Sequence, residues 1–307
     1  MESSPGECDL YRARPTCCAL VALDDQFIEA PVREAIASVL DGCWQRPRRR
    51  PCLSLDLGAN NGWMSAYMLM MGSFVVAVEP ASDLALAASE TAEVNCWADR
   101  FEMVVGWACA DIEYETTAHK LPPDSTKWNM GSYCPSRFGS LPLHGHRAGG
   151  KPRNLTARLR TAFPIRLHEL LFHRRPAAWP TARASARASP PHFDLIKLDG
   201  DGPERIWLRN LADLISARRI SVDAIAVETL HFSGLRPEDM LQLQSGLGYH
   251  IHRIGDYDRP LPAGLEEERF GMRAIRRAFR LKRNLTLGEW TNVLSRDGQY
   301  LLSRSSL

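Results

Sequence analysis

Residues 53–80 carry the pattern that most constrains what this chain can fold into. An apolar run ends at Asp56, a turn bounded by Gly58 and Gly62 follows, and a second apolar run ends at Glu79. Glycine lets the backbone turn tightly and approach a ligand closely. The pattern therefore predicts a buried strand, a turn, a helix and a second strand of a parallel sheet.

The same stretch has the features of a nucleoside site. Free backbone amides at the start of the helix would point at a ligand on the turn. Glu79 lies 23 residues after Asp56 (79 − 56), close to the spacing of roughly 20 residues at which a second-strand acid binds ribose hydroxyls. The dinucleotide fingerprint Gly-x-Gly-x-x-Gly is absent, because it would require glycine at Asp56 or Asn60. An NAD-dependent oxidoreductase is therefore disfavoured, and a carboxylate at the strand end suits a ligand with a cationic group.

The turn resembles the first motif of class I methyltransferases. The run Asp56-Leu57-Gly58-Ala59-Asn60-Asn61-Gly62, followed by Glu79-Pro80, is similar to the D-x-G-A-N-x-G and E-P signatures of the FkbM family of methyltransferases. This resemblance implies S-adenosylmethionine as the cofactor, with an acid near its amino end, the turn around its methionine portion and a second acid on its ribose. The implied cofactor-binding residues are Asp56, Gly58, Ala59, Asn60, Gly62 and Glu79.

A second motif lies more than a hundred residues further along the chain. The run from Phe193 is apolar and ends in acids around a turn, and it resembles the family's K-x-D-x-E-G-x-E, carried onto Lys197, Asp199, Asp201, Gly202 and Glu204. Asp201 stands where the family has Glu and is one methylene shorter. Pro203 and Glu204 suit the start of a helix, so Glu204 also fits a capping role.

Two further strand ends complete the predicted site. The apolar strand that begins near Val222 reaches Glu228, which matches a family Glu, and His231. Ligands bind beyond the carboxyl ends of parallel strands, so the candidate bases for an acceptor hydroxyl are Asp199, Asp201 and His231. Trp107 follows a predicted third strand. In class I methyltransferases, which the turn resembles, the end of this strand borders the adenine, so Trp107 would either stack on that ring or belong to the core.

The alternation of elements predicts a Rossmann-like class I methyltransferase fold, with a mostly parallel central sheet flanked by helices. Residues 1–50 are expected to form a tail and a flanking helix over 27–40, and residues 51–307 the main domain. Helices are expected over 63–71 and 82–95, and strands over 101–105 and 299–303.

A long basic loop insertion is predicted at about 112–192, where Glu169 is the only acid between residues 125 and 193. It would either bind an acidic substrate or RNA backbone, or have no role, and the second interpretation is favoured because aromatic residues are sparse. Residues 269–283 are expected to form a basic amphipathic helix. A catalytically silent methyltransferase fold that binds a partner through these basic segments is the alternative function.

Composition limits the remaining possibilities. Hydrophobic content of 45% and charged content of 24% are typical of a globular protein, and no apolar run reaches membrane-spanning length. The eight cysteines have no zinc-site spacing, so no metal is expected, and free thiols in a reducing compartment are predicted. With acids near the N-terminus and no signal peptide, the expected location is the cytoplasm.

The family resemblance implies a small-molecule, glycan or lipid hydroxyl as the acceptor. It does not distinguish a sugar, a lipid or a secondary metabolite. Nucleic acid is a less favoured partner, and the oligomeric state is left open.

Overall fold

The computed structural model describes part of the chain. The described residues are 30–41, 43, 51–109, 141–142, 161–162, 164–179, 190–200, 203–229, 235–254, 266–267, 279–280, 286–288 and 298–304. Most of the predicted basic insertion at 112–192 lies outside them, and so do Asp201 and His231.

The main sheet places strands from both halves of the chain side by side. Its parallel part contains β1 (Leu53–Leu57), β2 (Phe74–Glu79), β3 (Phe101–Val105), β8 (His192–Leu198) and β9 (Ser221–Thr229). Its remaining strands are β10 (His250–Ile254), β11 (Glu266–Glu267), β12 (Phe279–Arg280) and β13 (Gly298–Ser303). The order across the sheet is β11-β12-β10-β13-β9-β8-β1-β2-β3. The chain therefore leaves β1 in one direction for β2 and β3, and later returns to its other side with β8.

This order defines a topological switch point between β1 and β8, where open α/β sheets bind ligands. The strands β3, β2, β1, β8 and β9 follow the 3-2-1-4-5 order of dinucleotide-binding sheets. The next position differs, because β13 is inserted antiparallel between β9 and β10. The predicted Rossmann-like, mostly parallel sheet is confirmed.

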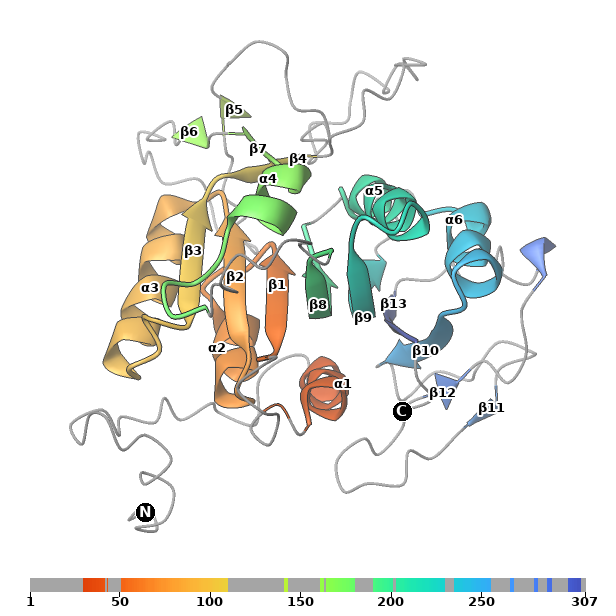
Figure 1. Ribbon diagram of the computed structural model, residues 1–307, viewed down its shortest axis with the longest axis horizontal. Helices are drawn as coiled ribbons and strands as arrows, with labels where there is room; N and C mark the ends of the chain where they lie inside the picture. Colours follow the sequence, from red (N-terminus) through yellow and green to blue (C-terminus); the bar gives the residue numbers. More distant parts are fainter. Residues whose placement is uncertain are drawn as a thin grey trace, which may run out of the picture.

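Helices cover both faces of the sheet (Figure 1). One layer contains α1 (Ala30–Leu40), α2 (Trp63–Met70) and α3 (Ser82–Val94), and the other contains α4 (Leu167–His173), α5 (Glu204–Ser216) and α6 (Pro237–Leu241). Because side chains alternate along a strand, Leu53, Leu55 and Leu57 of β1 pack on the α4–α6 side. Asp56 lies between two of these leucines and therefore points to the α1–α3 side.

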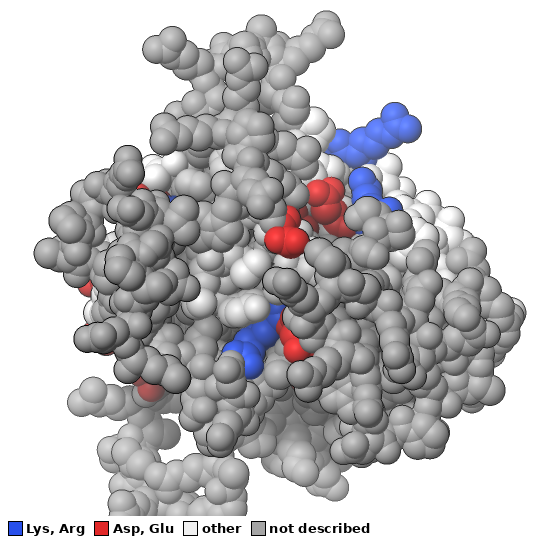
Figure 2. Space-filling model, turned by 90° about the horizontal axis from the view of Figure 1, so that it is seen from below, with Lys and Arg blue, Asp and Glu red and all other residues white. Residues whose placement is uncertain are grey.

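Four short strands come between β3 and α4 in the described part of the sequence and form two small sheets of their own. β4 (Trp107–Cys109) pairs with β7 (Pro164–Arg166), and β5 (Leu141–Pro142) pairs with β6 (Thr161–Ala162). On the face that Figure 2 shows, the described charged side chains carry both signs in small groups.

The predicted basic helix over 269–283 is wrong in its described part. Phe279 and Arg280 form β12, which pairs antiparallel with β10 and with β11. These two residues supply hydrogen-bonding partners for the backbone groups on the outer edge of β10. Such pairing between distant segments overrides the helical preference of the local sequence. The other residues of that segment lie outside the described part of the chain.

The prediction of free thiols is also wrong. Cys43, which follows α1, forms a disulfide with Cys52, which directly precedes β1. Cys96 and Cys109 are disulfide-bonded as well, and no described cysteine is free. Disulfides persist in oxidising compartments and are rare in the cytoplasm, so the argument for a reducing compartment no longer holds. No helix in the described part of the chain is long and apolar enough to cross a membrane.

Candidate functional site

The glycine turn after β1 is fixed to the neighbouring strand by its backbone. Gly58 and Ala59 both donate their N–H groups to the carbonyl of Val78, at 3.1 and 3.0 Å. Gly58 and Gly62 have φ values of +80° and +81°, in the left-handed region that favours glycine. Asn60 has a φ of 53°, and Asn tolerates this region better than most residues.

Both glycines also allow close packing of the segments around the turn. A Cβ atom on Gly58 would lie 1.7 Å from the carbonyl oxygen of Asp199. A Cβ atom on Gly62 would lie 2.4 Å from the Cβ of Ala88 in α3. The first contact brings the turns after β1 and β8 against each other, so the two predicted halves of the site are adjacent.

Glu79 ends β2 and lies directly beside this turn. Its Oε2 accepts a hydrogen bond from the N–H of Asn60 at 2.8 Å, and its Oε1 accepts one from the N–H of Ala81 at 2.8 Å. Burial raises the pKa of Glu79 above its usual value, although the two backbone hydrogen bonds act in the opposite direction. Each carboxylate oxygen has a second acceptor position, which is what a ribose hydroxyl would need.

Asp56 is completely buried and faces other side chains of the protein. Its Oδ2 accepts a hydrogen bond from Ser65 Oγ in α2 at 2.6 Å, and its Oδ1 lies 3.4 Å from Lys197 Nζ. The structure therefore places this acid beneath the turn, where it orients α2 and balances the charge of Lys197. Its predicted role near the amino end of a cofactor remains a prediction.

Lys197 joins the ends of β1 and β8. Its Nζ donates to Asp199 Oδ2 at 2.9 Å and lies 3.5 Å from the carbonyl oxygen of Gly58. Only 7% of its side chain is exposed, so an ammonium group is held inside the switch point. The sequence motif contained Lys197 without giving it a role, and the signal that could have revealed one was a lysine within an otherwise apolar strand.

Asp199 follows β8 and meets a second carboxyl group from β9. Burial acts to raise its pKa, but Lys197 and a hydrogen bond with the Glu228 side chain outweigh burial and lower it. The backbone N–H of Asp199 donates to the carbonyl of Leu57 at 3.0 Å, which fixes the residue to the end of β1. Glu228 was matched to the family but not predicted as a site residue, because its contact with Asp199 depends on the pairing of β8 with β9.

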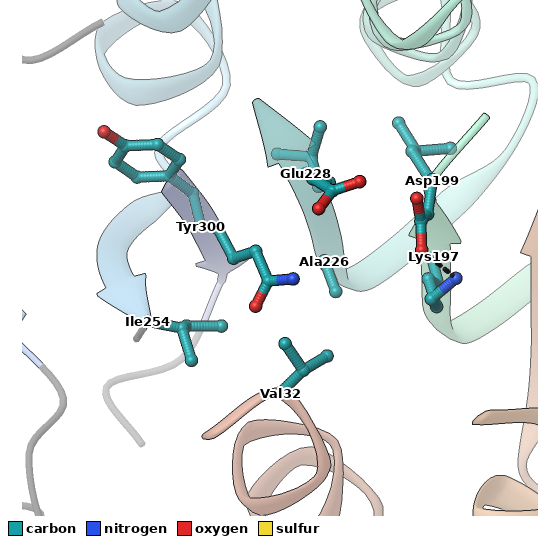
Figure 3. Close-up of a pocket in the computed structure, with 10 residues that line it drawn as sticks. Val32, Lys197, Asp199, Ala226, Glu228, Ile254 and Tyr300 are labelled. Carbon is teal, nitrogen blue, oxygen red and sulfur yellow. Dashed lines mark hydrogen bonds and ion pairs between the residues drawn. The ribbon is translucent and has the colours of Figure 1, made fainter. Parts of the chain in front are cut away.

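A small hollow lies beside these two acids, between α1 and the strands β8, β9, β10 and β13 (Figure 3). Its free volume is about 10 Å³, close to what one water molecule requires. It is therefore a water-sized space and not a chamber for an acceptor molecule. Its lining residues are Val32, Lys197, Leu198, Asp199, Ala226, Val227, Glu228, Ile254, Gln299 and Tyr300.

Trp107 and Glu204 complete the described part of the predicted site. Trp107 lies in β4 and is 8% exposed, and its indole N–H has no hydrogen-bond partner among the described residues. A buried donor without a partner costs free energy, so a ligand that accepted from it would relieve that cost. Glu204 accepts a hydrogen bond from the N–H of Gly200 at 2.7 Å and holds the turn after β8 in place.

A second polar cluster lies at the opposite ends of the central strands β8 and β9. His192 Nε2 lies 3.2 Å from Asp223 Oδ2 and 3.7 Å from Asp194 Oδ1, at the starts of β8 and β9. Burial acts to lower the pKa of His192, but its hydrogen bonds with both carboxylates outweigh burial and raise it. The cluster lies at the starts of β8 and β9, away from the strand ends that form the switch point, so it is separate from that site.

Comparisons with known proteins show distant structural likeness. No protein-family model matches the chain. No curated protein matches it.

The matching solved structures include the C-terminal domain of precorrin-6Y C5,15-methyltransferase from Rhodobacter capsulatus, with 14% identity and a TM-score of 0.36 over 91% of this chain and 90% of that one. The O-methyltransferase TomG from Streptomyces achromogenes has 12% identity and a TM-score of 0.35 over 92% and 84%. A putative O-methyltransferase from Klebsiella pneumoniae has 11% identity and a TM-score of 0.37 over 91% and 82%. Likeness at this level does not assign a ligand or a reaction, and membership of the FkbM family stays a prediction.

Proposed function

We propose that this chain is an S-adenosylmethionine-dependent methyltransferase that acts on a hydroxyl group. The observation that carries the proposal is the hydrogen bond from Asn60 N–H to Glu79 at 2.8 Å. It joins the glycine turn and the second-strand acid into one site, where a ribose would meet Glu79 and the rest of the ligand would follow the turn. The indole N–H of Trp107 supports the proposal, because Trp107 lies two residues after the end of β3 and this donor has no partner among the described residues.

Methyl transfer from a sulfonium needs little covalent help from the protein. The carbon is already activated, so the site must mainly align the acceptor oxygen, the methyl group and the sulfur, and remove a proton from the hydroxyl. Gly58, Ala59, Asn60, Gly62 and Glu79 would contact the cofactor, and the negative charge of Asp56 would favour its cationic amino end from beneath the turn. Asp199 lies on the far side of the turn, where the methyl group would be presented. The acceptor is proposed to be a sugar, a lipid or a secondary metabolite, as the family resemblance implies.

Calorimetric titration with S-adenosylhomocysteine and with NAD tests this proposal. We expect S-adenosylhomocysteine to bind and NAD not to bind. Glu79→Gln should weaken S-adenosylhomocysteine about 10- to 100-fold, because hydrogen bonds to a charged group contribute about 1.5–3 kcal/mol. Glu102→Gln is the matched control: this carboxyl lies on the adjacent β3, is partly buried and pairs with Arg174 away from the turn. It should leave the affinity unchanged.

Each other outcome has a separate meaning. Binding of neither ligand would reject the enzyme and favour a methyltransferase fold that serves as a binding module. Binding of NAD alone would show that the ligand assignment is wrong. Unchanged affinity in a folded Glu79→Gln protein would show that Glu79 does not contact the ribose.

A further inference from the structure

Four ionisable side chains from three neighbouring strands meet at the switch point. They are Asp56 of β1, Lys197 of β8, Asp199 after β8 and Glu228 of β9. If all four were ionised, three negative charges would surround one positive charge in a largely buried place. Such a cluster is strongly disfavoured, because unbalanced charge in the protein interior is costly.

A proton bound to Asp199 or Glu228, which lie side by side, would remove one of these negative charges. Ionised carboxylates can only accept hydrogen bonds, and a carboxyl group donates one only when it carries a proton. The two side chains line the same small hollow, and carboxyl groups held close together are more stable when one of them carries a proton, because two ionised carboxylates repel each other. In Figure 3 the two carboxyl groups face each other from adjacent strands.

The surroundings decide which of the two carries the proton. Lys197 Nζ lies 2.9 Å from Asp199 Oδ2, and an ammonium at this distance favours the ionised form of its partner. This contact favours Asp199 as the ionised member of the pair and Glu228 as the member that carries the proton. The Asp199 side chain is 23% exposed while that of Lys197 is 7% exposed, so Asp199 is the more accessible of the two groups.

We propose that Asp199 takes the proton of the acceptor hydroxyl, and that Glu228 and Lys197 are positioning residues that keep Asp199 ionised and oriented. This inference rests on the proposed function. In the reaction the acceptor O–H bond breaks and its proton moves to Asp199, while an oxygen lone pair forms the new bond to the methyl carbon. The carbon–sulfur bond breaks and its electrons stay on sulfur, so the sulfonium becomes a neutral thioether. The negative charge of Asp199 and the positive charge of the sulfonium disappear in the same step.

Carbon-13 NMR of protein labelled at its Asp and Glu carboxyl carbons tests the shared proton. The signals of the pair are assigned by their loss in Asp199→Asn and in Glu228→Gln. In the wild-type protein near neutral pH, we expect the Glu228 carboxyl carbon to have the chemical shift of a protonated group and the Asp199 carboxyl carbon that of an ionised group. In Asp199→Asn the Glu228 signal should move toward that of an ionised carboxylate, because the neighbouring negative charge is gone while Lys197 remains.

The control is Asp223→Asn, which changes a half-exposed carboxyl near the start of β9, at the opposite end of the strand from Glu228, and should leave both signals in place. Two ionised or two protonated carboxyls near neutral pH in the wild-type protein would overturn the inference. A titration with S-adenosylhomocysteine on the same sample separates the two proposals. If that ligand fails to bind while the pair holds its proton, the proposed function fails and the shared proton stands.

Discussion

Lys197→Met is expected to lower the free energy of unfolding by about 3–5 kcal/mol, the usual cost of removing one partner from a buried ion pair. Lys197 Nζ lies 2.9 Å from Asp199 and 3.4 Å from the fully buried Asp56. Methionine has a similar length but no charge, so both carboxylates lose their counterion. Urea denaturation followed by circular dichroism measures the change.

The pH dependence of this loss identifies its electrostatic origin. In the wild-type protein the pKa of Asp199 is lowered, against the effect of burial, by Lys197 and Glu228. A lowered folded-state pKa contributes stability above the unfolded value, and that contribution disappears as the pH falls through the folded value. The difference between Lys197→Met and the wild type should therefore shrink toward acid pH. A difference independent of pH would indicate that only packing was lost.

Arg209→Met is the control, because it also replaces a paired cation by methionine but at a more exposed position. Arg209 Nε lies 3.7 Å from Asp239, its side chain is 37% exposed, and Asp239 keeps a closer partner in Arg205 at 2.8 Å. Because Arg205 still pairs with the buried Asp239 and Arg209 itself is half-exposed, this variant should lose less than about 1 kcal/mol.

Removal of the Cys43–Cys52 disulfide is expected to destabilise the protein by about 2–4 kcal/mol, because the bridge limits the conformations of the unfolded chain. The double variant Cys43→Ala/Cys52→Ala removes it, and urea denaturation without reductant measures the cost. The bridge ties the end of α1 to the start of β1, and Val32, Ala35, Ile36 and Leu40 of α1 are all buried against the sheet layer. Its loss should therefore also increase amide hydrogen exchange in α1.

Alkylation gives an independent check of the bridge. When the unreduced protein is unfolded in the presence of iodoacetamide, Cys43 and Cys52 should remain unlabelled, and both should be labelled after reduction. Labelling of both residues without reduction would show that the thiols are free and would contradict the bridge.

The parts of the site that the sequence predicted are the local ones. The turn from Gly58 to Gly62 was predicted because a glycine pattern between two apolar runs determines it within one supersecondary unit. Glu79 was predicted from its spacing, and its contact with Asn60 follows from parallel pairing of β1 and β2. Asp199 was predicted because it ends an apolar strand.

The parts that could not be predicted depend on contacts between distant segments. The position of Lys197 between Asp56 and Asp199 requires β8 to lie beside β1, which hydrophobic periodicity does not determine. The Cys43–Cys52 pairing cannot be deduced from spacing, since eight cysteines allow many connectivities. The helical pattern near Phe279 lost to strand pairing along β10, because edge hydrogen bonds outweigh a weak local preference.

A crystal structure of the protein with S-adenosylhomocysteine tests the central claim most directly. The account predicts that the ribose hydroxyls lie within hydrogen-bonding distance of Glu79, that the adenine lies near Trp107, and that the sulfur is directed toward Asp199. A ligand bound away from the Gly58–Gly62 turn, or bound with its adenine toward Asp199, would contradict it.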